Sequence, residues 1–427
     1  MSRLAVRGGD TAVGSRWARL RALMADAKVP LLVYALMSMF SAALVAVGGW
    51  RQAELPGDDS RFVGWFPVEI LDRYLGVVSN WDGRWYREIA EVGYPVPLPR
   101  AEDGQVLQNA WAFWPLYPAI VRAVMEITKL SFEPTAWVVS IICTATAVVV
   151  LYRWIEPRMG AFGAGAVVAC LLAFPSAPIL QMGYAESLAL LLLVLALSSL
   201  ARMRYGLVCL FAILLSLTRP VALPLAAVVV IHGALRWLAD RRRQQDFSSR
   251  ERLSVALTAV ACAGSMGLWP VLADFVVGEQ GIYVKTLSAW PVNQDSVGVL
   301  GGWVPELFRL TPLGFVCVCL LAWIVYLAIR RESQYWPTEV RAWALAYAPF
   351  IFIGTRPSSS IYRYLLFTIL LALPFPEVVA RRPGSRWEWV RVTTFLVLVL
   401  GVSLSLQFFW VMGYLTIAAS STEQPYP

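Results

Sequence analysis

The sequence predicts an all-α protein that crosses a membrane many times. Of its 427 residues, 58% are hydrophobic and only 15% are charged, and its mean hydropathy is +0.61. One soluble core could not bury that much apolar surface, whereas helices that face lipid leave it exposed. Several apolar runs also approach the roughly 20 residues that a helix needs to cross a bilayer. These observations predict a polytopic membrane protein.

The chain begins with a basic segment, residues 1–29, which we expect to be an irregular tail on the cytoplasmic side. The apolar run that follows, Pro30 to Trp50, is longer than the core of a signal peptide, which is roughly 7–15 residues. It therefore predicts an uncleaved first span with a cytoplasmic N-terminus. Residues 51–133 then form an external loop, which opens with a polar, proline-rich stretch.

One apolar segment of this loop, Ala112 to Val121, is too short to cross the membrane. Pro115 and Pro118 interrupt it, and charged residues follow at once. If this segment did cross, the later arginine clusters would face outward, against the positive-inside tendency. We therefore predict a re-entrant or surface-lying helix on the external side.

The remaining apolar runs complete about eleven spans in a single membrane domain, residues 30–427. This arrangement leaves a second external loop at 278–310. It puts Arg241–Arg243 and Arg381–Arg382 in the cytoplasm, where they would act as orientation signals and contact anionic lipids. The further spans are expected near 135–154, 161–182, 186–201, 206–218, 220–238, 254–277, 311–330, 341–355, 361–379 and 392–416.

The composition also argues against several classes of function. The net charge is +8, but the arginines lie between spans, so no nucleic acid is expected as a partner. The six cysteines lie in apolar runs without Cys-x-x-Cys spacing, which argues against disulfides and a zinc site. The single histidine, His232, is expected to be a packed or interfacial imidazole rather than a ligand. We expect no cofactor, and dependence on a divalent metal stays open.

The densest polar segment of the chain is Asn80–Tyr94, in the first external loop. Asp82 stands near its start, between Trp81 and Gly83, and the glycine suggests a flexible point. Two roles of Asp82 stay open at this stage, since an aspartate here can cap a helix or act as a catalytic base.

A helix over 84–92 would give this segment two faces. One face would be polar and available to a substrate. The other would be apolar and could lie on lipid headgroups. The polar face holds Arg84, Glu88 and Glu91, and the apolar face holds Trp85, Ile89 and Val92.

Further ionisable residues stand at the external ends of predicted spans. Glu186 begins a span, where it is either an acid that the helix dipole stabilises or a functional residue of a site. Arg219 either reaches the interface from between two apolar runs or binds phosphate. Arg356 and Arg363 bracket a serine-rich turn. The planar guanidinium of arginine matches the arrangement of phosphate oxygens, and its attraction to them is stronger near a low-dielectric boundary. These residues together therefore suit a lipid-linked anionic substrate.

A series of short motifs runs in order along residues 75–220, with an echo near Arg363. The motifs are Trp81-Asp82, Ile89-Ala90, Gly93-Tyr94, Ala112-Phe-Trp-Pro-Leu-Tyr-Pro118, Pro175, Tyr184-Ala-Glu-Ser187, Thr218-Arg219 and Tyr362-Arg-Tyr364. Their order resembles that of the PIG-V family of mannosyltransferases, which use a polyprenyl-phosphate-mannose donor. The resemblance implies a GT-C fold, in which the first external loop carries the catalytic aspartate, here Asp82. It departs at Gly83-Arg84 and does not reach the second external loop, so the acceptor stays open.

Together these features predict an inverting sugar transfer at the external face of a cell membrane. Asp82 would be the base, and Arg219 with Arg356 or Arg363 would hold the leaving lipid phosphate. Glu186 would orient the sugar or the acceptor. The donor would be a polyprenyl-phosphate-sugar and the acceptor a glycolipid or glycan, with membrane lipids around them. The other residues of the expected substrate-binding set are Trp81, Arg84, Glu88 and Tyr94.

Two other classes of protein fit a multi-span chain. A flippase of lipid-linked sugars would need charges near mid-span and usually an inverted repeat. Here the charges gather at one face, and no repeat is evident. A non-catalytic subunit of a membrane complex is harder to separate from an enzyme by sequence. A nucleotide-sugar donor is disfavoured, because the polar cluster faces away from the cytoplasm and lacks an Asp-x-Asp metal motif.

Overall fold

The structure is a computed structural model that describes residues 10–52, 69–290, 312–355, 360–380 and 383–417. These residues form helices and connecting turns and contain no strand, only an isolated bridge between Arg100 and Val106. The helices are α1 (Asp10–Trp50), α2 (Glu69–Val78), α3 (Asp82–Glu91), α4 (Leu116–Thr128), α5 (Phe132–Leu172), α6 (Glu186–Ala201), α7 (Tyr205–Ser216), α8 (Ala222–Arg241), α9 (Ser249–Ser265), α10 (Leu268–Val277), α11 (Ile282–Ser288), α14 (Pro312–Ile329), α15 (Thr338–Gly354), α16 (Ile361–Leu365), α17 (Pro376–Ala380) and α18 (Arg386–Trp410).

Helix length and composition support a multi-pass membrane protein. Within the described ranges, four helical segments are long and apolar enough to cross a bilayer, and α9 with α10, bent by 43°, makes a fifth if counted as one span. Helices α6, α7 and α14 are apolar but shorter. The predicted number of about eleven spans is therefore not confirmed. The four long segments are Ala27–Trp50, Phe132–Leu172, Ala222–Arg241 and Arg386–Leu415.

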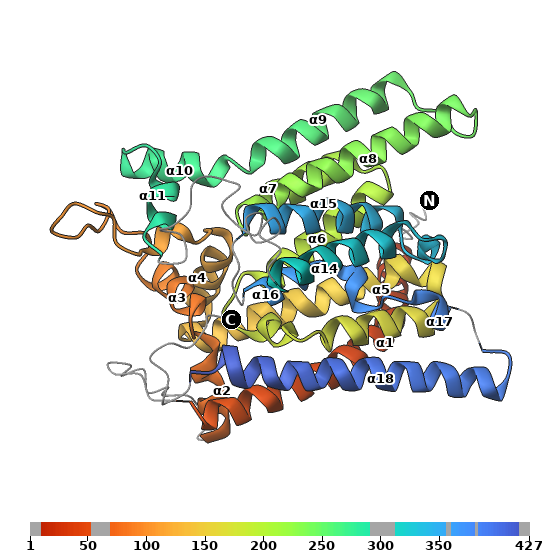
Figure 1. The fold of residues 1–427 in the computed structure, drawn as a ribbon, viewed down its shortest axis with the longest axis horizontal. Helices are drawn as coiled ribbons and strands as arrows, with labels where there is room; N and C mark the ends of the chain where they lie inside the picture. The colour runs from red at the N-terminus through yellow and green to blue at the C-terminus, as the bar shows by residue number, and fades with distance from the viewer. Residues whose placement is uncertain (1–9, 53–68, 291–311, 356–359, 381–382, 418–427) are drawn as a thin grey trace, which may run out of the picture.

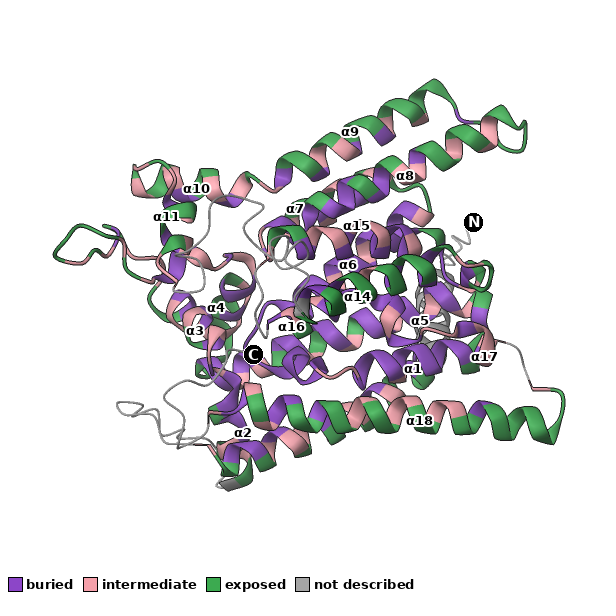
Figure 2. Cartoon of the chain, in the orientation of Figure 1, coloured by how far each residue is buried: buried purple, intermediate pink, exposed green. Residues whose placement is uncertain are grey.

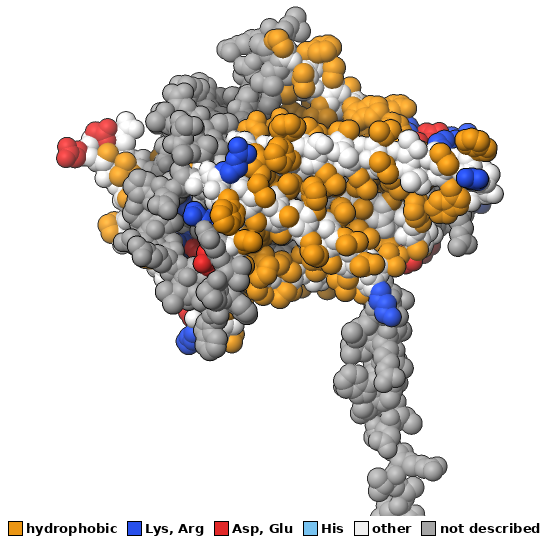
Figure 3. All heavy atoms as spheres, turned by 90° about the horizontal axis from the view of Figure 1, so that it is seen from below, with side chains coloured by type: hydrophobic (Ala, Val, Ile, Leu, Met, Phe, Trp, Pro, Cys, Tyr) orange, Lys and Arg blue, Asp and Glu red, His pale blue; other side chains and the backbone are white. Residues whose placement is uncertain are grey.

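The outer surface of the helices is apolar, as lipid contact requires. Hydrophobic side chains cover the long flank of the molecule in Figure 3, and the charged side chains visible there lie toward its two ends. On α18, Val397, Leu398 and Val402 are each more than 60% exposed. The core lies instead around α5, α6 and α15, whose inward faces are buried (Figure 2). This large exposed apolar belt indicates that lipid, rather than water, surrounds this part of the protein.

The polar segments gather at two opposite ends of the helix bundle. Figure 1 shows α2, α3, α4, α10 and α11 at one end, and the α8–α9 connection with α17 at the other. Helices α2, α3, α4 and α11 belong to the two predicted external loops, whereas α10 lies in the predicted span 254–277. The α8–α9 connection is a predicted cytoplasmic segment, whereas α17 lies almost wholly in the predicted span 361–379. The side of the membrane that each end faces stays a prediction.

Several predicted boundaries are wrong. Helix α1 begins at Asp10, so most of the basic segment 1–29 is helical rather than irregular. The predicted spans 135–154 and 161–182 meet within α5, which bends at Gly160, where a φ of 71° lies in the left-handed region that glycine adopts readily. The short helix predicted at 112–121, within the first external loop, is present with other bounds, as α4 at Leu116–Thr128. Whether α4 is re-entrant or lies on the surface stays a prediction.

Two predicted spans are not continuous helices. The α-helical part of 161–182 ends at Leu172, and 361–379 is divided between α16, the 3-10 turn Ile369–Ala372 and α17. Pro175 follows the end of α5, and Pro374 precedes α17. Proline lacks a backbone donor and clashes with the preceding helical turn, so neither stretch continues as one helix. Both irregular stretches are largely buried. Irregular backbone is tolerated at membrane depth only where protein covers it, so these stretches belong to the interior.

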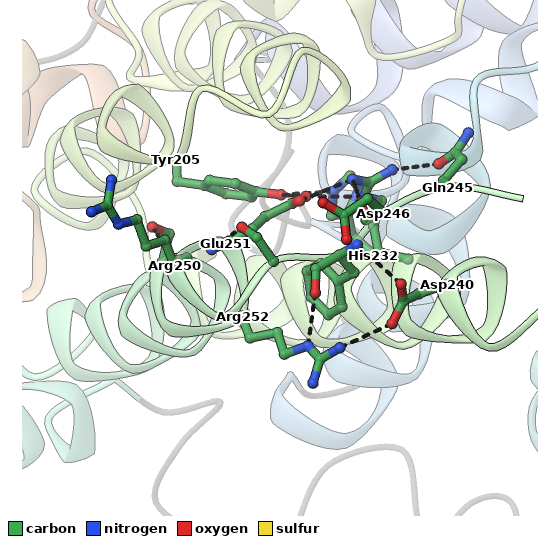
Figure 4. Close-up of polar contacts among 12 residues, drawn as sticks. Tyr205, His232, Asp240, Gln245, Asp246, Arg250, Glu251 and Arg252 are labelled. Atoms are coloured by element: carbon green, nitrogen blue, oxygen red, sulfur yellow. Dashed lines mark hydrogen bonds and ion pairs between the residues drawn. The ribbon is translucent and has the colours of Figure 1, made fainter. Parts of the chain in front are cut away.

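A network of polar side chains joins α7, α8 and α9 at the end far from α3 (Figure 4). Arg236 donates to both carboxylate oxygens of Glu251 at 2.9 Å, and the Tyr205 hydroxyl donates to the same carboxylate at 2.9 Å. His232 lies 3.4 Å from that hydroxyl and 3.3 Å from Glu339 of α15. His232 is therefore a packed imidazole, as predicted, within a network that holds the helices together.

Candidate active site

Four charged residues from four separate parts of the chain meet in one cluster. Asp82 begins α3, Glu186 begins α6, Arg219 lies between α7 and α8, and Arg363 lies in α16. Arg363 Nη1 donates to Asp82 Oδ2 at 2.7 Å and lies 3.4 Å from Glu186 Oε1. Arg219 forms an ion pair with the same Glu186 oxygen. The structure therefore brings together the four residues that sequence reasoning had chosen separately.

The ion pairs of this cluster are buried and therefore strong, except that the carboxylate of Asp82 stays partly exposed. The exposed fraction of the side chain is 1% for Glu186, 4% for Arg363 and 12% for Arg219, but 29% for Asp82. Charges in such a low-dielectric site interact strongly, and an unpaired one would be costly. The Nε atom of Arg363 has no hydrogen-bond partner among the described residues. The cluster thus offers a partly exposed carboxylate beside a buried guanidinium.

Asp82 is not the N-cap of its helix, so the structure removes the capping role that the sequence had left open beside catalysis. The N-cap residue of α3 is Trp81, with φ of 51°, and no side chain caps the helix. Asp82 is the first helical residue, and its carboxylate pairs with Arg363 instead. The indole of Trp81 donates to the carbonyl oxygen of Leu415 at 3.1 Å, so Trp81 anchors this turn to the C-terminal part of the chain.

The turn before α3 is fixed by the buried segment that precedes α6. Gly183 N donates to Val78 O at 2.9 Å, and the Tyr184 hydroxyl donates to Asn80 O at 2.7 Å. The guanidinium carbon of Arg363 lies 5.5 Å from the centre of the Tyr184 ring. Tyr184 therefore positions both Asp82, through the backbone, and Arg363, through a cation–π contact. Sequence reasoning quoted Tyr184 as a motif residue but gave it no role.

Gly83 is held in a close contact, contrary to the flexible point that we expected. A Cβ at Gly83 would lie 2.8 Å from Val78 O and 3.3 Å from the Tyr184 ring. We predict that Gly83→Ala lowers the free energy of unfolding by about 1–3 kcal/mol, the usual cost of overpacking, and lowers activity by displacing Asp82. Thermal melting and transfer assays of the purified variant measure both effects.

Gly76→Ala is the matched control for that substitution. Gly76 lies in α2, and a Cβ there would meet nothing within 4 Å. Alanine in a helix interior is roughly 0.5–1 kcal/mol more stable than glycine, so Gly76→Ala should melt at or above the wild-type temperature. If both variants melt alike, close packing at Gly83 has no energetic role.

Aromatic side chains surround the buried part of the cluster. The guanidinium carbon of Arg219 lies 5.4 Å from the Tyr364 ring centre and 5.9 Å from that of Phe367. Tyr86, four residues after Asp82 and on the same side of α3, is buried, and this burial raises the pKa of its phenol well above the ordinary value. Tyr86 therefore stays neutral. Its helical spacing from Asp82 is the signal that could have found it.

The other predicted substrate-binding residues lie outside this cluster. Arg84 is exposed, and its guanidinium carbon lies 5.0 Å from the centre of the Trp85 ring. Glu88 is half-buried; burial raises the pKa of its carboxyl, and nearby Arg84 opposes that shift. Tyr94 packs on Trp111, with ring centres 4.5 Å apart, and belongs to a separate aromatic core. Arg356 lies outside the described residues.

The predicted lipid-facing side of α3 is also wrong in part. Ile89 is buried at 6% exposure, and Trp85 stacks on Phe113 rather than on headgroups. Val92 alone of the three is exposed, at 82%. Apolar periodicity selects a face but does not say whether lipid or protein covers it.

The described part of the chain contains no group of three or more His, Cys, Asp and Glu side chains that could hold a metal ion. The six cysteines are free thiols.

The fold has counterparts among solved structures. No family model and no curated protein matches the chain. An archaeal oligosaccharyltransferase, AglB from Archaeoglobus fulgidus, solved with an inhibitory peptide and a dolichol-phosphate, matches with a TM-score of 0.50 and 12% identity over 92% of this chain. The same enzyme tethered to an acceptor peptide matches with a TM-score of 0.50 and 13% identity.

These neighbours are glycosyltransferases with the GT-C fold. The chain spans little more than half of their length, 56% in both cases. At this identity the likeness concerns the fold alone, so it supports the predicted fold without reaching the PIG-V family in particular. The chain is thus a multi-pass membrane protein with the fold of the GT-C glycosyltransferases.

Proposed function

We propose that this chain is a mannosyltransferase that moves a sugar from a polyprenyl-phosphate-mannose donor to a glycolipid or glycan acceptor at the external face of the membrane. One observation carries the proposal: the partly exposed carboxylate of Asp82 lies 2.7 Å from the buried guanidinium of Arg363. A base and a phosphate-binding cation are the two groups that transfer from a lipid phosphate needs. The fold shared with oligosaccharyltransferases and the PIG-V-like motifs support the class of reaction and the sugar.

In the proposed reaction an acceptor hydroxyl attacks the anomeric carbon of the donor sugar. Asp82 takes the hydroxyl proton as the new carbon–oxygen bond forms. The bond between the anomeric carbon and the phosphate oxygen breaks, and its electron pair leaves with the lipid phosphate. One displacement inverts the anomeric configuration. Arg363 and Arg219 stabilise the charge that develops on the phosphate, in a site where fixed cations act strongly.

Glu186 has a positioning role in this proposal. We expected it to orient the sugar or the acceptor, but its side chain is 1% exposed and contacts both arginines. It would hold the two guanidiniums close together despite their mutual repulsion. Such an arrangement is preorganised and costs no reorganisation during the reaction.

Donor binding would also release the base. Arg363 pairs with Asp82, and this contact occupies the carboxylate oxygen nearest to the guanidinium. A donor phosphate competes for the same guanidinium, so its arrival would free Asp82 to accept a proton. This exchange predicts that the donor must bind before Asp82 can accept the proton of the acceptor hydroxyl.

The test uses the purified chain in lipid vesicles with polyprenyl-phosphate-mannose labelled in the sugar. We expect label to move to an added glycolipid or mannoside acceptor, with release of polyprenyl phosphate, while GDP-mannose is not consumed. Label that crosses the vesicle bilayer without donor cleavage would make the chain a flippase. Absence of both cleavage and crossing by the pure chain would contradict the enzyme proposal and favour a non-catalytic subunit.

A further inference from the structure

Three aromatic side chains from distant segments meet beside the charged cluster. Trp85 lies in α3, Phe113 follows the 3-10 turn Ala110–Ala112, and Trp290 follows α11. The Trp85 and Phe113 rings stack with centres 5.8 Å apart and planes 18° apart, and Trp290 lies 5.8 Å from Trp85 and 6.1 Å from Phe113. All three are half-buried. We call this group the aromatic platform.

The platform differs from the other aromatic cluster at this end of the molecule. In that second cluster Trp111 is 1% exposed and Trp269 is 5% exposed, so those rings serve as a packed core. The rings of the platform keep part of their surface open although they are large and apolar. Trp side chains are typically left half-open where one side must meet a polar partner.

The position of the platform relates it to the proposed base. Trp85 follows Asp82 by three residues in α3, so the two side chains leave neighbouring sides of the helix with a rise of roughly 4.5 Å between them. This separation is about the width of a pyranose ring. A sugar with one hydroxyl at Asp82 would therefore place its ring, or the ring linked to it, beside Trp85.

Polar groups at the platform complement a sugar. A pyranose has an apolar face of C–H groups and a rim of hydroxyls. Arg84 and Glu88 flank Trp85 on α3 and supply a donor and an acceptor for such hydroxyls. The Arg84 guanidinium lies over the Trp85 ring without a ligand. Such exposed cation–π contacts are worth only about 0.5–1 kcal/mol, so a sugar can displace this one.

We propose that the aromatic platform binds a pyranose ring of the acceptor, so that the acceptor of this enzyme is already a glycoside rather than a bare lipid or protein hydroxyl. This inference rests on the proposed function, which supplies Asp82 as the base. It assigns Trp85 and Trp290, together with Phe113, to acceptor recognition, separate from the arginines that would bind the donor phosphate.

The test measures binding apart from turnover. Calorimetric titration of methyl α-D-mannopyranoside is carried out on the Asp82→Asn protein and on the same protein with a second substitution. We expect saturable binding to Asp82→Asn, at least about tenfold weaker binding with Trp85→Ala, equivalent to about 1.4 kcal/mol, and near-normal binding with Trp85→Phe. Trp387→Ala is the matched control, because Trp387 is 81% exposed at the start of α18.

A comparison of Trp85→Phe with Trp85→Leu separates stacking from packing. Both substitutions keep an apolar side chain, but only phenylalanine keeps a ring face. Weaker binding by the leucine variant, at equal melting temperature, supports the platform. Equal binding by the two variants, unchanged binding with Trp85→Ala, or no saturable binding to the Asp82→Asn protein would each overturn it.

The two proposals fail in different ways. Mannoside binding that depends on Trp85, without any cleavage of polyprenyl-phosphate-mannose, would leave the platform standing and remove the proposed reaction. Transfer to mannosides with an acceptor KM that Trp85→Ala does not change would keep the reaction and remove the platform. In the supporting case, Trp85→Ala raises the acceptor KM about tenfold while the donor KM stays the same.

Discussion

Replacement of Asp82 by asparagine is expected to lower the transfer rate by about a hundredfold to ten-thousandfold, the usual contribution of a general base. The amide keeps the size of the side chain but cannot accept the proton of the acceptor hydroxyl. Asp82 is the partly exposed member of the pair, the amide oxygen can still accept from Arg363, and Arg363 keeps its contact with Glu186, so the melting temperature should stay close to that of the wild type. Single-turnover cleavage of labelled polyprenyl-phosphate-mannose and a thermal melt measure the two quantities.

Asp72→Asn is the control for that loss. Asp72 is an exposed carboxylate on α2, so its conversion to an amide changes the same chemical group outside the cluster. We expect wild-type transfer from this variant. An Asp82→Asn protein with wild-type activity would remove Asp82 as the base and leave it a structural partner of Arg363.

Loss of the Arg363 guanidinium should reduce both stability and activity. Arg363→Met leaves Asp82 and Glu186 with one cation, Arg219, to share, and breaking a buried ion pair typically costs about 3–5 kcal/mol. Arg363→Lys keeps the charge but loses the planar fork, so we expect it to fold better than Arg363→Met and still to lose about a hundredfold to a thousandfold in transfer rate. Denaturation followed by intrinsic fluorescence and transfer per folded protein check these effects.

Arg236→Met provides the comparison at the other end of the bundle. Arg236 also forms a bidentate ion pair, with Glu251, within the network of Figure 4. Its loss should lower stability without lowering transfer per folded molecule. Full activity of Arg363→Lys would contradict a role of that guanidinium at the leaving phosphate.

The sequence was informative about the site because charge is rare in this chain. Only 15% of residues are charged, so each ionisable side chain at the end of an apolar run is conspicuous. The positive-inside tendency sorted the runs, and this sorting placed Asp82, Glu186, Arg219 and Arg363 toward one face. Contact between Asp82 and Arg363, which are 281 positions apart, depends on how α3 and α16 dock, and no local pattern encodes that docking.

Other features could not be predicted from the sequence, for a physical reason. Lipid and protein interior are both apolar, so the hydrophobic pattern of α3 could not tell that protein would bury Ile89 or that Trp85 would stack on Phe113. The same ambiguity made 361–379 look like a span, although it is divided into α16, a 3-10 turn and α17 inside the protein. Tyr184 acts through the backbone oxygen of Asn80, a contact that no side-chain pattern reveals.

The cluster of two arginines and two carboxylates is formally neutral without a ligand. In the proposed reaction the donor phosphodiester carries one negative charge, and the product phosphate monoester carries between one and a half and two, by the usual rule of about −1.5 to −2 at pH 7. When Asp82 takes the acceptor proton, the cluster becomes net positive at the moment when the leaving phosphate becomes more negative. Attraction between enzyme and lipid is then greatest after the chemistry, and it relaxes when Asp82 passes its proton to water. Release of polyprenyl phosphate would therefore be the slow step, and added polyprenyl phosphate should inhibit transfer.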